Sequence, residues 1–78
     1  MDQKLVRQII EALRQAGPGG ETEMSFLLEE LTGWPEAEIN DTVDYLVMVG
    51  SLSAAQSTFQ EGAVVVWIDP KVTFHFEL

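Results

Sequence analysis

Apolar side chains recur every three or four positions along the first part of the chain. This spacing gives a helix one continuous apolar face, so it predicts a helix from about residue 3 to residue 16. Asp2 is suited to cap its N-terminus, and Gly17 and Pro18 are suited to end it, with Gly17 in a left-handed conformation. The apolar positions are Leu5, Val6, Ile9, Ile10, Leu13 and Ala16.

Two further helical patterns follow. Ser25 is a candidate N-cap for a second, short helix. Pro35 suits the first position of a third helix, because a proline loses no hydrogen bond there, and Gly50 is expected to end that helix after about Val49. The apolar residues of the second helix are Phe26, Leu27, Leu28 and Leu31, and those on the core side of the third are Ile39, Val43 and Leu46.

Beyond Gly50 the apolar period changes from helical to alternating, which is typical of strands. Residues 51–55 and 63–68 predict two strands joined by a loop at residues 57–62. The linker at residues 21–24 is expected to pair one or two residues with this sheet.

The last residues of the chain also alternate. Val72, Phe74, Phe76 and Leu78 share one face, which predicts an extra C-terminal strand that pairs with residues 64–68. The complete prediction is one α+β domain over residues 1–78. It consists of three helices followed by a small antiparallel sheet of two to three strands, with the extra C-terminal strand.

The segments at residues 25–39 and 43–52 contain a turn at Gly33 and a helically spaced series of apolar residues that ends at Gly50. A strand rich in β-branched residues follows them. This arrangement resembles the winged helix-turn-helix superfamily over about residues 3–68. The resemblance implies a winged-helix-like fold, whose third helix enters the DNA major groove when the domain binds DNA. The same fold also serves protein recognition. The chain departs from the DNA-binding pattern in its charge and in the extra strand at residues 72–78.

Charge argues against nucleic acid as the partner. The chain has 4 Lys and Arg against 13 Asp and Glu, a net charge of −9, and no Lys, Arg or His lies between Gln15 and Pro70. If the domain bound DNA, cations on the third helix and on the hairpin, which is called the wing in this fold, would have to neutralise phosphates. That neutralisation supplies most of the affinity of DNA-binding proteins. A basic protein surface is the partner that this charge favours.

The sequence contains few of the residues and motifs on which catalysis commonly depends. The chain has no Cys, a single His at position 75, no phosphate-binding Gly-rich loop and no metal-ligand spacing. We therefore expect no enzyme, no catalytic residues, no metal and no cofactor. The absence of Cys and of a long apolar run predicts a cytoplasmic protein without a membrane span.

Two surfaces are candidates for binding. The outward side of the third helix places apolar and acidic side chains together, as an acidic-rimmed site for a partner protein. The second surface would serve self-association as a homodimer, because the strand at residues 64–68 is apolar on both faces and aromatic residues are enriched at interface centres. The first comprises Glu38, Asp41, Asp44, Tyr45 and Met48, and the second Trp67, Phe74 and Phe76.

Three functions remain open at this point. The leading hypothesis is a non-catalytic protein-protein interaction module, an adaptor or regulatory subunit. The alternatives are a DNA-binding transcriptional regulator of the winged helix-turn-helix type and an acidic nucleic-acid mimic that blocks a basic protein site. Salt-dependent DNA affinity would identify the regulator, and competition with nucleic acid for a target would identify the mimic.

Overall fold

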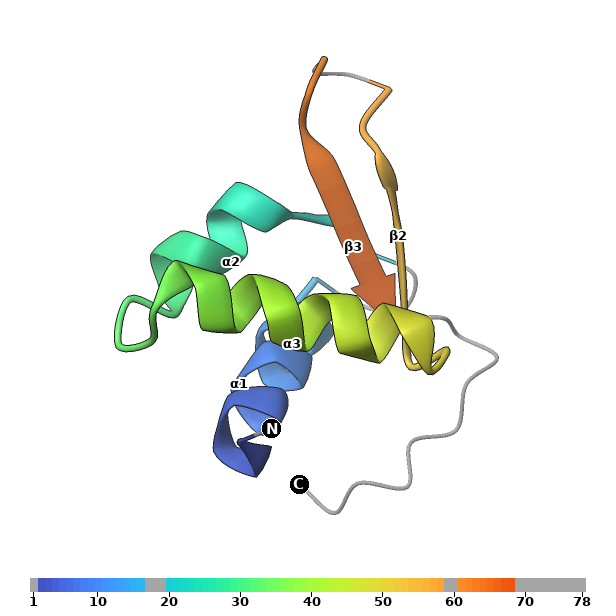
Figure 1. Cartoon of the computed structure of the whole chain (residues 1–78). Coiled ribbons are helices and arrows are strands. Elements are labelled where there is room, and N and C mark those ends of the chain that lie inside the picture. The colour runs from blue at the N-terminus through green and yellow to red at the C-terminus, as the bar shows by residue number, and fades with distance from the viewer. Residues whose placement is uncertain (1, 17–19, 59–60, 69–78) are drawn as a thin grey trace.

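The computed structural model describes residues 2–16, 20–58 and 61–68. Within these ranges the chain forms three helices and a three-stranded antiparallel sheet (Figure 1). The predicted α+β class and its helices and sheet are confirmed, while the predicted strand at residues 72–78 lies outside the described residues. The elements are α1 (Gln3–Arg14), β1 (Thr22–Glu23), α2 (Met24–Glu30), α3 (Glu36–Met48), β2 (Leu52–Gln56) and β3 (Val64–Ile68).

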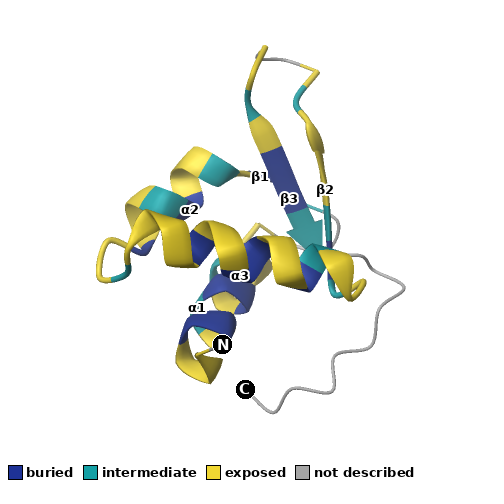
Figure 2. Ribbon diagram, viewed as in Figure 1, coloured by how far each residue is buried: buried dark blue, intermediate teal, exposed yellow. Residues whose placement is uncertain are grey.

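Helix α1 begins as predicted and supplies much of the core. The Asp2 carboxylate accepts a hydrogen bond of 2.9 Å from the backbone N–H of Lys4. The predicted apolar face is buried, as Figure 2 shows along α1, except for Ala16, which lies beyond the end of the helix and is exposed. The predicted role of Gly17 falls outside the described residues. The buried positions are Leu5, Val6, Ile9, Ile10 and Leu13.

Helix α2 starts one residue before its predicted cap. Strand β1 runs directly into the helix, so the extended residue that precedes it is Glu23 and not Ser25. The Ser25 cap is therefore wrong, and the Ser25 hydroxyl instead donates a long hydrogen bond of 3.4 Å to the Glu23 carboxylate. Leu27 and Leu31 face the core, whereas Phe26 is 48% exposed.

The connection between α2 and α3 is tied to α1 by one side-chain hydrogen bond. The Trp34 indole N–H donates to the Gln8 side-chain oxygen over 2.8 Å. Pro35 is extended and is the N-cap residue of α3, so the helix begins at Glu36, one residue later than predicted. The Pro35 carbonyl accepts hydrogen bonds from the N–H groups of Glu38 and Ile39. This arrangement fixes where α3 begins relative to α1.

Helix α3 turns its predicted side toward the core. Ile39, Val43 and Leu46 are buried, which confirms the orientation read from the sequence. Thr42 is buried as well, and its hydroxyl donates a 2.8 Å hydrogen bond to the Glu38 carbonyl. That bond satisfies a polar group that would otherwise be costly to bury.

Gly50 ends α3 in a left-handed conformation, with φ of 85°. The Ser51 N–H donates to the Leu46 carbonyl and the Gly50 N–H to the Val47 carbonyl, which is the hydrogen-bond pattern of a Schellman motif. The chain then enters β2 directly.

Strand β3 lies in the middle of the sheet. The order of the strands in the sheet is β1-β3-β2, with Thr22 opposite Val66 and Leu52 opposite Ile68. Val65 and Val66 of β3 have strand partners on both sides. Residues 72–78 lie outside the described residues, so their predicted pairing with residues 64–68 stays a prediction. Among the described residues, β1 and β2 are the outer strands of the sheet.

The core fills the space between α1, α3 and the sheet. Leu27, Leu46, Leu52 and Val66 pack with the buried face of α1 in one cluster. None of the helices in the described ranges has the length and apolar character that crossing a membrane requires.

Leu46→Ala is expected to lower the free energy of unfolding by about 2 to 5 kcal/mol, since the side chain is only 1% exposed within the core cluster. The exposed substitution Asp41→Ala on the same helix should change it by less than about 0.5 kcal/mol. Urea unfolding of both variants measures the difference. Equal effects would mean that α3 is rotated differently about its axis.

Gly50→Ala should destabilise the protein by about 1 to 2 kcal/mol, because an L-residue is strained at this positive φ. Gly33→Ala is the matched control. An added methyl group meets nothing within 4 Å at either position, but Gly33 has no positive φ. Equal losses of stability in thermal melts would show that backbone strain at Gly50 is not the cause.

Candidate protein-interaction surface

The outward side of α3 carries the acidic residues predicted to bind a partner. Glu38, Asp41 and Asp44 are exposed and lie three residues apart, so they follow one side of the helix. With Tyr45 and Met48, which are 41% and 84% exposed, they form a surface that we call the acidic face. Every predicted member of this site is therefore exposed on α3.

An apolar patch lies at the C-terminal end of the acidic face. Tyr45, Met48 and Val49 are spaced three and four residues apart, and Val49 is 55% exposed. Sequence reasoning treated Val49 only as the end of the helix and missed it as a surface residue. Its spacing of four from Tyr45 was the signal that could have placed it here.

The start of α1 adds a further carboxylate to this surface. Asp2 lines a shallow hollow of about 190 Å³ together with Glu38, Asp41, Thr42 and Tyr45. The sequence separates Asp2 from these residues by two helices, so no local pattern could have shown the association. Asp2 lies beside the acidic face because α1 and α3 pack against each other.

The acidic face continues toward the sheet. Asn40 and Asp44 stand at a groove of about 200 Å³ that α3 forms with the β2–β3 hairpin and the first residue of α2. Its wall is otherwise apolar, and Val64 on that wall is 39% exposed. A partner on α3 could therefore also reach the hairpin. The apolar residues of the wall are Met24, Val43, Val47, Ala54, Val64 and Val66.

Positive charge among the described residues is confined to α1. Lys4, Arg7 and Arg14 are exposed there, and neither α3 nor the described part of the hairpin contains Lys, Arg or His. An anionic ligand would thus meet carboxylates on α3 without an opposing cation on the same helix. Like charges placed against each other at an interface cost free energy.

Within the described ranges, no three His, Cys, Asp or Glu side chains are grouped so that they could hold a metal ion. His75 lies outside those ranges. Exposed ion pairs contribute only about 0.2 to 1 kcal/mol each, so the apolar patch would have to supply much of the affinity of a complex.

The predicted self-association surface is described only in part. Trp67 is half-buried on β3 and lies opposite Ser53 of β2. Alternation along the strand places it on the same face as Val65, away from the core residue Val66. Phe74 and Phe76 fall outside the described residues, so self-association through this surface stays a prediction.

Comparisons of the chain with protein-family models, with curated proteins and with solved structures found no significant match. The resemblance to winged helix-turn-helix proteins accordingly stays a prediction from the sequence.

Proposed function

We propose that this protein is a non-catalytic interaction module of the winged-helix type, acting as an adaptor or regulatory subunit. The single observation that carries this proposal is the composition of the acidic face: exposed carboxylates lie beside exposed apolar side chains, and the helix has no cation. The partner is a protein with a basic, partly apolar surface. The proposed location is the cytoplasm.

The order of the elements supports the winged-helix part of the proposal. Two helices joined by a short turn precede a β-hairpin, and Gly50 leads α3 directly into that hairpin. In a winged helix that binds DNA, the outward side of α3 would face the major groove. Here that side carries Glu38, Asp41 and Asp44, which favours a protein in the same place.

The apolar patch favours a protein partner over a purely ionic contact. Met48 is almost fully exposed, and Tyr45 combines an apolar ring with a hydroxyl group. Aromatic residues and Met are enriched at the centres of protein interfaces, while charged residues are found at the rim. The acidic face has this arrangement, with Asp41 and Asp44 beside the apolar side chains.

Affinity capture from the native lysate tests the proposal. The unmodified 78-residue chain should retain a basic protein that the Asp41→Asn/Asp44→Asn and Tyr45→Ser/Met48→Ser variants each lose. The Asp41→Asn/Asp44→Asn substitutions should reduce retention of the partner less at high salt, because salt screens exposed charges. All the substituted side chains are exposed, so urea unfolding should show little change in stability.

Glu29→Gln/Glu30→Gln is the matched control, because it removes two exposed carboxylates from α2 and leaves the acidic face intact. It should retain the same partner as the unmodified protein. If the acidic-face variants also retain every bound protein, the proposed surface is wrong. If nucleic acid displaces the partner, the protein acts as a nucleic-acid mimic instead of an adaptor.

A further inference from the structure

Strand β2 is an outer strand of the sheet without the protection that outer strands usually have. Among the described residues it pairs with β3 on one side only, in a continuous register that runs from Leu52 opposite Ile68 to Gln56 opposite Val64. In Figure 1, β2 lies on the side of the hairpin that faces away from α2. Natural proteins protect outer strands with charged side chains, prolines or bulges. Strand β2 has none of these three features.

The charge of the chain is also absent from this strand. Residues 45–60 contain no Asp, Glu, Lys, Arg or His, and they form the longest stretch of the sequence without these residues. The net charge of the chain is −9, so the acidic face of α3 would repel the same face of a second copy. At β2, a second copy would meet no opposing carboxylate on the strand itself.

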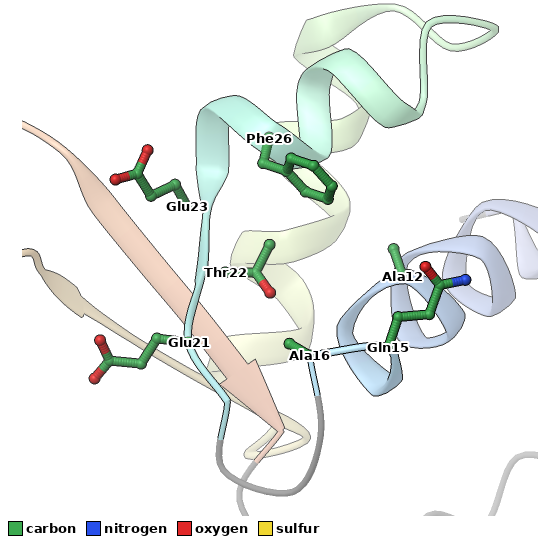
Figure 3. A pocket seen from close by; sticks show the side chains of 7 residues that line it. All are labelled: Ala12, Gln15, Ala16, Glu21, Thr22, Glu23 and Phe26. Carbon is green, nitrogen blue, oxygen red and sulfur yellow. The ribbon is translucent and has the colours of Figure 1, made fainter.

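The other outer strand, β1, is protected. It consists only of Thr22 and Glu23, and Glu21 precedes it. Figure 3 shows the carboxylates of Glu21 and Glu23 on one side of this strand and the side chain of Thr22 on the other. A very short outer strand that carries charge is a poor template for pairing with another chain. Of the two outer strands, β2 is therefore the one suited to pairing.

The backbone groups that β2 turns away from β3 belong to alternate residues. The Ser57 N–H donates to the Ala63 carbonyl over 2.8 Å, so these two residues form a hydrogen-bonded pair. Hydrogen-bonded and non-hydrogen-bonded pairs alternate along an antiparallel ladder. Residues 53 and 55 therefore bond to β3, and residues 52, 54 and 56 turn their N–H and C=O groups outward. These outward groups are arranged symmetrically about Ala54.

We propose that β2 pairs antiparallel with β2 of a second copy of this chain, with Ala54 opposite Ala54 of that copy. Residue 52 then faces residue 56 of the second copy, so this one register gives a hydrogen-bond partner to every outward N–H and C=O group of residues 52–56. The contact is self-complementary about a two-fold axis. It joins two three-stranded sheets into one sheet of six strands, in the order β1-β3-β2-β2-β3-β1. The proposal does not depend on the acidic face.

The small size of this contact makes the expected dimer reversible. Two paired strands of five residues bury less surface than the about 1,200 to 2,000 Å² of stable interfaces. The like charges of two copies repel each other, so added salt should strengthen the dimer by screening that repulsion. A contact between the acidic face and a basic protein should weaken with salt. A dimer that salt dissociates would therefore overturn the proposal.

Nuclear Overhauser measurements on a mixture of isotope-labelled and unlabelled copies of the 78-residue chain test the register. Non-hydrogen-bonded partners in an antiparallel pair have Cα atoms about 4.5 Å apart. With Ala54 at the two-fold axis, these partners are Ser53 of one copy and Ala55 of the other, and we expect a contact between their Hα atoms. Three results would overturn the proposal: a dimer without this contact, pairing of β2 with residues 72–78 of its own chain, or a monomer by light scattering up to about 1 mM.

Isosteric substitutions at Ala54 supply a second test. Ala54 is exposed, and Ala54→Asp would place two carboxylates opposite each other across the two-fold axis, whereas the matched control Ala54→Asn adds no charge. The dimer Kd from sedimentation equilibrium at low salt should be up to about fivefold higher for Ala54→Asp than for Ala54→Asn. Urea unfolding checks that both variants remain folded. Equal Kd values would contradict the proposal, because the two side chains would then not face each other.

Discussion

The buried face of α1 is the constraint on which the rest of the structure depends. Its five apolar side chains are at most 1% exposed, and α2, α3 and β3 all contact this helix. A domain of 78 residues has room for one small core, so these elements must share the same apolar surface. Once Ile39, Val43 and Leu46 are committed to that core, the helical period determines which side of α3 remains outside.

The residues that α3 buries in the core therefore determine which residues it exposes to solvent. A helix cannot turn Glu38, Asp41 and Asp44 inward without exposing Leu46 and burying three carboxylates, and unpaired buried charges are very costly. The Trp34–Gln8 hydrogen bond and the left-handed Gly50 fix the two ends of the helix. The acidic face is consequently presented as a fixed surface, which suits recognition of a partner.

The sequence predicted those features that depend on local periodicity. The buried stripe of α1, the core side of α3 and the end of α3 at Gly50 each follow from residues a few positions apart. The predicted cap of α2 was wrong because β1 passes directly into the helix. Local residue propensities do not show that a strand and a helix are joined without a connecting turn. The position of Asp2 beside the acidic face depends on contacts between segments that are distant in the sequence, so no local pattern predicts it.

We propose that α3 binds protein and not DNA, and a duplex-DNA titration followed by fluorescence anisotropy at ~150 mM salt tests this proposal most directly. The account predicts no binding in the range of about 10⁻⁴ to 10⁻⁶ M in which even non-specific DNA-binding proteins are found. Micromolar binding that weakens steeply as salt rises would contradict it, because phosphates would then be neutralised despite the carboxylates of α3.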